Sequence, residues 1–344
     1  MHPTPRVAED AGPAAAAAAV TGAYGALRSG AIVVDRSDRS RWRFTGPRAA
    51  ETLTGLVTND VLALMPGEGL YAAALTPKGK IVADLRIFRD DDGLLADTGP
   101  AAAEGWRAMA RKFVNPRVAP FAEVSERTSD TGVFGSRAAE LLSRVFETDA
   151  NAFHQLQPYS HVRARLRSSS EDVTVVRAAE LGEVPGFDII APAQITDELR
   201  AGLGSIGAVA ATRDLFDIAR IEAGFPEWGV DMNEDTLPQE ANFDDLGAIS
   251  YSKGCYVGQE TVARIHFRGH VNKMLRRVRF NADAVPPRGA ALADEAGKSV
   301  GAITSAALSP RQGGVGIAMV RREVEAGATL IAQWGSEQTD VSVA

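Results

Sequence analysis

The chain has 344 residues, of which 45% are hydrophobic and 24% are charged, a composition typical of soluble globular proteins. This length exceeds what one ordinary hydrophobic core supports, so we expect two or three domains. The formal net charge is −7, which argues against a protein that coats nucleic acid, because phosphate contacts need an excess of Lys and Arg.

The N-terminal residues and the single cysteine narrow the class of protein further. The stretch MHPTPRVAEDAGPAAAAAAV (1–20) has alanine and acidic residues where a secretory signal has leucine and basic residues. No stretch approaches the roughly 20 apolar residues of a membrane span. One cysteine excludes an internal disulfide, a CxxC-type site and a self-contained iron–sulfur site. We expect a cytoplasmic protein with no membrane partner, whose residues 1–22 form a mobile tail leading into a short helix.

The first third of the chain alternates between strand and helix patterns. Breaks at a PKG turn and a DDDG turn divide residues 69–99 into strands, the second break being a plausible hairpin. Trp106, Met109 and Phe113 lie at helical spacing and predict one buried face. Strands are expected within residues 31–46 and 69–99, and helices within 46–57 and 101–116.

The remaining two thirds divide into a second mixed unit and a strand-rich end. Thr212 is a candidate N-cap of the last long helix before the strand-rich end, and Gly224 a candidate stop. In the second unit we expect strands at 118–126, 161–167 and 172–180, and helices at 136–146, 195–203 and 211–226. Past Lys273 we expect a small β-barrel with strands near 276–280, 289–292, 299–306, 314–320 and 329–335.

These patterns predict an α+β protein of three domains with a C-terminal β-barrel. One α+β domain combines residues 23–117 with 208–262, and a second spans 118–207. The barrel domain spans 263–344.

Two carboxylates stand where a carboxylate is costly. Asp84 lies in mid-strand, between apolar residues, on one face with Val82, Arg86 and Phe88. That face is either solvated, as is common in antiparallel sheets, or covered with partners for the carboxylate. Glu222 lies near the C-terminal end of a helix, where the helix dipole disfavours an anion. It is either a surface residue or an acceptor aimed into a pocket, suited to two parallel N–H donors of a heterocycle.

The stretch KGCYVGQETVAR (253–264) holds the only cysteine. Cys255 stands between glycines, two residues from Lys253 and just ahead of a predicted helix. The lysine and the helix N-terminus would both favour a thiolate. Gly254 and Gly258 permit a tight or positive-φ backbone. A small buried hydrophobe is the other common role of a free cysteine, and the residues alone leave both readings open.

Metal and nucleic-acid sites are not predicted. His266 and His270 are four residues apart, but Gly269 lies between them and no carboxylate follows at a useful spacing, so we expect no metal site. The run 264–280 carries six Lys or Arg residues and no acid. It is either the wet face of the last domain or a positive patch that receives an anion. Direct RNA binding is not expected, because Phe267 is the only aromatic residue before the end of this run.

Eight consecutive residues, KGCYVGQE (253–260), resemble the signature of the YgfZ branch of the family that includes the glycine-cleavage T-protein, an aminomethyltransferase. The stretches 46–88 and 220–243 resemble the N-terminal and central blocks of that family, and 301–310 with 316–322 resemble parts of its C-terminal barrel. The resemblance implies three domains around a central channel that holds tetrahydrofolate.

The resemblance also implies site residues. Tyr71 and Asp84 keep the family's thirteen-residue spacing between a pocket tyrosine and the carboxylate near the folate N5/N10 region, and Glu222 matches the glutamate that binds the pterin amino edge. We expect both acids and the thiol to converge on one cavity. The implied folate-binding residues are Tyr71, Asp84, Glu222, Lys253 and Arg264, and the implied catalytic residues are Cys255 and Asp84.

The YgfZ branch is linked to assembly or repair of iron–sulfur enzymes and, through one of them, to tRNA modification. The expected partners are therefore a reduced folate and iron–sulfur client or assembly proteins. T-proteins typically have two adjacent aspartates where this chain has Ala83-Asp84, a tyrosine where it has Trp228, and no cysteine motif. These departures favour the YgfZ branch over two alternatives: a folate-dependent aminomethyltransferase, and a non-enzymatic interaction protein that retains the pocket.

Overall fold

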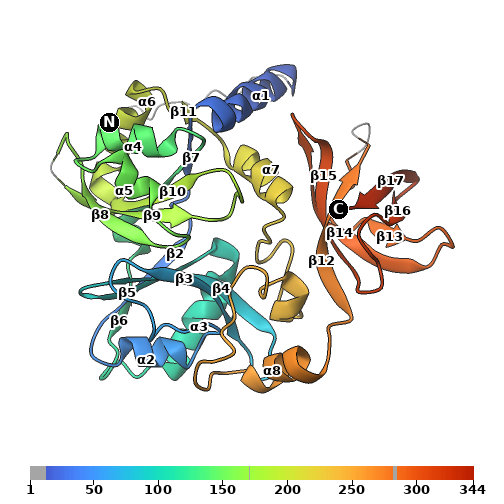
Figure 1. The fold of residues 1–344 in the computed structure, drawn as a ribbon, viewed down its shortest axis with the longest axis horizontal. Coiled ribbons are helices and arrows are strands. Elements are labelled where there is room, and N and C mark those ends of the chain that lie inside the picture. The colour runs from blue at the N-terminus through green and yellow to red at the C-terminus, as the bar shows by residue number, and fades with distance from the viewer. Residues whose placement is uncertain (1–12, 170, 282–284) are drawn as a thin grey trace, which may run out of the picture.

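The computed structural model describes residues 13–169, 171–281 and 285–344, which form two open sheets with flanking helices and a closed barrel (Figure 1). This mixed architecture with a C-terminal barrel confirms the predicted fold class. Most strands and helices lie where the hydrophobic pattern predicts them.

The first sheet carries the residues of main interest. Its strand order is β3-β4-β5-β2-β6, and all its pairs are antiparallel. Trp106 and Met109 of α3 are buried in its core, whereas Phe113 is 44% exposed, so the prediction for Phe113 is wrong. Phe113 is the last residue of the helix, so it lies on the same stripe but at its exposed end. The elements are β2 (Ser40–Phe44), α2 (Ala49–Thr54), β3 (Gly69–Leu75), β4 (Ile81–Asp90), β5 (Gly93–Thr98), α3 (Ala103–Phe113) and β6 (Phe121–Glu123).

The second sheet has the order β11-β1-β7-β10-β9-β8. Its composition departs from the predicted domain division, because β1 and β11 belong to this sheet while β6 joins the first. Local sequence patterns identify strands but not their partners, so this exchange was not predictable from them. The elements are β1 (Ile32–Asp35), β7 (Thr128–Phe134), α4 (Ala138–Val145), α5 (Ala150–His154), β8 (His161–Arg165), β9 (Asp172–Ala178), β10 (Gly186–Pro192), α6 (Thr196–Ser205) and β11 (Val209–Ala210).

The C-terminal strands close into a barrel in the order β12-β15-β14-β13-β16-β17. Sequence patterns missed β17, because its residues are mostly polar and only Val341 and Val343 are buried in the barrel core. The strands are β12 (Lys273–Phe280), β13 (Ala291–Ala293), β14 (Ser299–Ser309), β15 (Gly313–Arg321), β16 (Thr329–Trp334) and β17 (Glu337–Val343).

Three further α-helices lie outside these groups: α1 (Pro13–Ser29) before β1, and α7 (Arg213–Ala223) and α8 (Gln259–Arg268) between β11 and β12. Helix α7 lies between the second sheet and the barrel (Figure 1) and packs against β14 and β15. Helix α1 begins at Pro13, well before the predicted end of the tail at residue 22, because alanine has the highest intrinsic helix propensity. Residues 1–12 of that predicted tail lie outside the described residues.

Candidate functional site

A cavity of about 40 Å³ lies where the two open sheets meet α7 and the segment after it. Tyr71 and Asp84 reach it from β3 and β4 of the first sheet. The other lining residues are Arg36, Arg39, Arg86, Gly99, Pro100, Glu180, Arg213, Phe216, Arg220, Phe225, Pro226, Glu227 and Trp228. Charged groups and aromatic rings thus share one small space.

Asp84 is the carboxylate in this cavity with an unused oxygen. Its Oδ2 atom accepts a hydrogen bond of 2.8 Å from the Tyr71 hydroxyl. Its Oδ1 atom is buried and has no hydrogen-bond partner among the described residues. Desolvation raises the pKa of Asp84, although Arg39 and the bond from Tyr71 oppose this shift. The predicted pairing of Tyr71 with Asp84 is therefore present, and the covered-face reading of β4 is correct.

The register of the first sheet explains this pairing. Ala73 lies directly opposite Asp84 across the β3–β4 ladder, so Tyr71 is a diagonal neighbour of Asp84 on the same face. Burial and the nearby carboxylate raise the pKa of Tyr71 well above its usual value. The tyrosine hydroxyl therefore remains a donor to Asp84 at any physiological pH.

Aromatic rings form one wall of the cavity. The Tyr71 ring lies 5.5 Å from that of Phe225 and stacks on Tyr159 at 5.9 Å between centroids. The indole Nε1 of Trp228 is buried and has no hydrogen-bond partner among the described residues. Gly224 directs the chain from α7 toward this wall with a φ of +75°, and a Cβ there would lie 2.7 Å from the Arg277 side chain.

Under the cavity a buried cluster of arginines and carboxylates joins the two sheets. Arg86 of β4 contacts Asp97 of β5 in its own sheet, and Asp130 of β7 and Asp188 of β10 in the second sheet. The full cluster contains three arginines and four carboxylates: Arg36, Arg39, Arg86, Asp97, Asp130, Glu180 and Asp188. Sequence reasoning missed it, although charged residues within apolar strands were an available signal.

The cluster has one carboxylate more than it has arginines, and the carboxyl group whose pKa is raised is that of Asp130. Burial and the neighbouring charge of Asp188 raise the pKa of Asp130 to about 7. Among the other carboxylates, burial also opposes ionisation of Glu180, but Arg36 and Arg86 outweigh it and lower its pKa to about 2. Near neutral pH the cluster therefore exchanges a proton mainly at Asp130.

The predicted convergence of Glu222 with Asp84 is wrong. Both carboxylate oxygens of Glu222 accept hydrogen bonds from the Tyr24 hydroxyl of α1, at 2.8 and 3.0 Å. Ser309 of β14 also donates to Glu222. Glu222 lines a different cavity, beside Arg277 and Arg279 of the barrel. Glu222 therefore joins α7 to α1 and β14. In the segment that follows α7, the carboxylate that lines the Asp84 cavity is that of Glu227.

Residues of the KGCYVGQE stretch also lie away from the Asp84 cavity. Cys255 is exposed, so the reading of it as a buried hydrophobe is wrong. Lys253 is buried and donates to the backbone carbonyls of Thr54 and Val57, the latter at 2.6 Å. Burial lowers the pKa of Lys253 to about 8, although the charges of Asp60 and Cys255 oppose the shift. Lys253 therefore fixes the loop to the end of α2 and does not line the cavity.

The helix that follows shows which glycine of the motif is required. Gly258 has a φ of +83°, and a Cβ there would lie 2.6 Å from the Thr76 carbonyl oxygen. Gly254 has no positive φ and no atom within 4 Å of an added Cβ, so of the two glycines only Gly258 has the predicted tight backbone. Arg264 is exposed on α8 and does not line the Asp84 cavity. Within the described residues there is no group of three His, Cys, Asp or Glu residues that could hold a metal ion.

Comparison with known proteins identifies the family. Residues 9–249 match the GCVT N-terminal domain, and residues 273–344 match the C-terminal beta-barrel domain of CAF17. The tRNA-modifying protein YgfZ of Escherichia coli O157:H7 is 29% identical over 257 residues, which are 71% of each chain. Its counterpart in Cronobacter sakazakii is 30% identical over 250 residues, 71% of this chain and 70% of that protein. This chain belongs to the YgfZ branch of the T-protein family.

A solved structure supports the same fold. The glycine cleavage system aminomethyltransferase T from Bartonella henselae superposes with a TM-score of 0.82 and 21% identity, covering 94% of this chain and 88% of that one. The predicted resemblance and fold are therefore confirmed. No helix among the described residues of this YgfZ-branch chain is long and apolar enough to cross a membrane.

Proposed function

We propose that this protein binds a reduced folate, such as tetrahydrofolate, in the Asp84 cavity and supports assembly or repair of iron–sulfur enzymes in the cytoplasm. The observation that carries the binding half is the unpartnered Oδ1 of Asp84, buried beside an aromatic wall. A buried acceptor without a donor is costly. A ligand N–H group removes that cost.

The chemistry of the cavity suits a pterin ring. Asp84 offers an acceptor and the Trp228 indole offers a donor, and neither has a partner among the described residues. A pterin carries N–H groups and acceptor atoms on one flat ring, so it can satisfy both. Tyr71 and Phe225 supply faces on which such a ring stacks.

The size of the cavity adds a requirement. About 40 Å³ holds only a few water molecules. A bicyclic ring therefore enters fully only when a lining side chain moves aside. Trp228 suits this movement, because it is only partly buried and its indole N–H forms no bond that would have to break.

Calorimetry with tetrahydrofolate tests the binding half. Asp84→Asn removes the negative charge but keeps the shape, so we expect at least about tenfold weaker binding, the loss of one charge-assisted hydrogen bond. Asp172→Asn is the matched control, because Asp172 is exposed on β9 and its ion-pair partner among the described residues is Arg165. Equal affinity of both variants, or no heat with the wild type at millimolar ligand, contradicts the proposal.

The iron–sulfur half is supported by the resemblance of residues 253–260 to the YgfZ branch and by the exposure of Cys255. An exposed thiol is available to a client protein, which a buried one is not. We expect Cys255→Ser to lower the activity of iron–sulfur enzymes in cells while tetrahydrofolate binding is unchanged. Cys255→Ser cells with full iron–sulfur activity would remove the thiol from the proposal and leave folate binding intact.

Aminomethyl transfer is the second candidate function. Asp84 favours it, because a carboxyl group whose pKa is raised inside a ligand cavity is suited to general acid–base catalysis. The test is formation of methylene-tetrahydrofolate from an aminomethylated lipoyl protein. Product that depends on Asp84 supports transfer, and no product with a competent lipoyl partner excludes it.

A further inference from the structure

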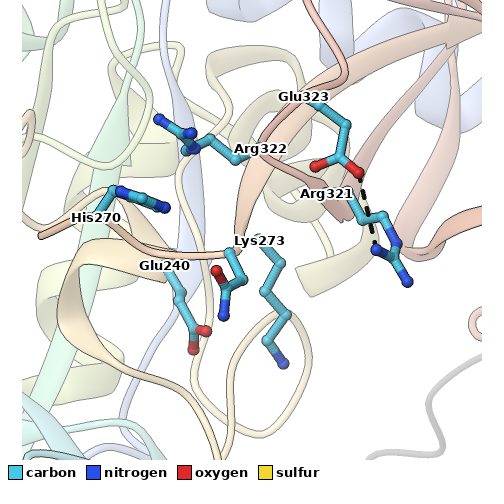
Figure 2. A pocket seen from close by; sticks show the side chains of 7 residues that line it. Glu240, His270, Lys273, Arg321, Arg322 and Glu323 are labelled. Atoms are coloured by element: carbon cyan, nitrogen blue, oxygen red, sulfur yellow. Dashed lines mark ion pairs between the residues drawn. The ribbon is translucent and has the colours of Figure 1, made fainter.

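A second cleft, of about 600 Å³, lies beside the first strand of the barrel. Figure 2 shows its basic side chains, which come from the segment after α8 and from the end of β15. Its lining residues are Glu240, His270, Asn272, Lys273, Arg321, Arg322 and Glu323. A volume of this size is typical of small-molecule sites.

The strand register brings two like charges together in this cleft. Lys273 of β12 lies directly opposite Arg321 of β15. Residues directly opposite in an antiparallel pair project from the same face, and like charges there are destabilising. Arg322 follows immediately, and its backbone N–H bonds to the Asn272 carbonyl at 2.9 Å. Three cationic side chains, Lys273, Arg321 and Arg322, therefore line one cleft at this end of the β12–β15 pair.

The two acids of the cleft compensate these charges only in part. Glu240 is buried and accepts a 2.8 Å hydrogen bond from the Leu237 backbone. Glu323 is shared between Arg321 at 3.7 Å and Lys298 at 3.8 Å, both exposed pairs, which are weak. Within the described ranges, neither the Lys273 ammonium nor the Arg322 guanidinium has a carboxylate or hydrogen-bond partner.

We propose that this cleft binds a multivalent anion, a small ligand with closely spaced phosphate or carboxylate groups. Arginine forks and a lysine ammonium are the side chains that recognise such oxyanions. Exposed His270 and Asn272 add donors at the rim. The chain has a net charge of −7, so the protein as a whole repels anions. The cationic cleft attracts them locally.

This site is separate from the Asp84 cavity. The two share no lining residue. Loss of anion binding therefore need not change tetrahydrofolate binding, and the two proposals fail independently.

Calorimetry with tripolyphosphate and with citrate, at about 50 mM and about 200 mM salt, tests the proposal. We expect the wild type to bind at least one probe more tightly at low salt. Lys273→Gln and Arg322→Gln should each weaken binding roughly tenfold, the loss of one charge-assisted contact. The preferred probe identifies the anion, phosphate-bearing or carboxylate-bearing.

Arg311→Gln is the matched control. Arg311 is exposed in the turn just before β15, roughly 30 Å from Arg322 along the strand. The Arg311→Gln variant should therefore bind the probe with an affinity within about twofold of the wild type. Thermal unfolding shows whether each variant keeps the fold. No heat with either probe at millimolar concentration overturns the proposal. Equal losses in all three variants also overturn it, because they would reflect only the total charge of the protein.

Discussion

The buried arginine–carboxylate cluster predicts a pH dependence of stability centred on Asp130. Its carboxylate is fully buried, and its Oδ2 atom lies 3.3 Å from Nη2 of Arg86. Asp188 is its diagonal neighbour across β7 and β10, and this negative charge disfavours ionisation of Asp130. Arg41 is also buried nearby, but its guanidinium donates to Ser and Thr oxygens instead.

The magnitude follows from the pKa difference between the folded and unfolded states. The pKa of Asp130 is about 7 when folded, against 3.8 for the free group. Between these values the folded state binds more protons than the unfolded state, so stability falls as pH rises. Integrated from pH 5 to pH 7, the loss is about 2 kcal/mol. Asp130→Asn resembles the protonated carboxyl and should not show this loss.

The assay is urea unfolding, followed by circular dichroism, of wild type and Asp130→Asn between pH 5 and pH 8. We expect the difference in unfolding free energy to move in favour of the variant by about 2 kcal/mol between pH 5 and pH 7. Groups that titrate alike in both proteins cancel in this difference. A difference that stays constant with pH, or one that moves in favour of the wild type, refutes the reasoning.

Three further substitutions test other contacts. Tyr71→Phe removes the 2.8 Å bond to Asp84, so calorimetry should show several-fold weaker tetrahydrofolate binding; unchanged affinity would show that Tyr71 does not orient Asp84. Gly258→Ala places a Cβ 2.6 Å from a carbonyl oxygen at a residue of positive φ, so it should lower the free energy of urea unfolding by about 2 kcal/mol. Gly254→Ala should leave it nearly unchanged, and similar losses in both variants would contradict the assignment of Gly258 as the required glycine. Glu222→Gln weakens the bonds to α1, so hydrogen exchange in residues 20–29 should accelerate while folate affinity stays within threefold.

Strand alternation in the sequence predicted the local part of the site. The period of two along β4 put Asp84 and Arg86 on one face, and that face proved to be covered by the second sheet and α7. The family resemblance added Tyr71, whose hydroxyl does bond to Asp84. These features were predictable because Tyr71 and Asp84 lie on one pair of neighbouring strands, β3 and β4.

Contacts between distant segments were not predictable in the same way. The sequence does not show that β4 and β7, which belong to different sheets, pack face to face, so the contact of Arg86 with Asp130 required the structure. The helical pattern of α7 does not show where the Glu222 side chain points. Its carboxylate accepts a hydrogen bond from Tyr24 of α1, and the sequence does not predict that α1 packs there. For Lys253, spacing along the chain suggested a partner thiol, while burial directed its ammonium to backbone carbonyls.

The most direct measurement is a crystal structure of this protein soaked with tetrahydrofolate. The ring should lie against Tyr71 and Phe225, with an N–H group within about 3 Å of Asp84 Oδ1 and with the Trp228 side chain displaced from its present position. A ring bound instead beside Glu222 and Arg277, or in the cationic cleft at Lys273, would contradict the assignment of the Asp84 cavity as the folate site.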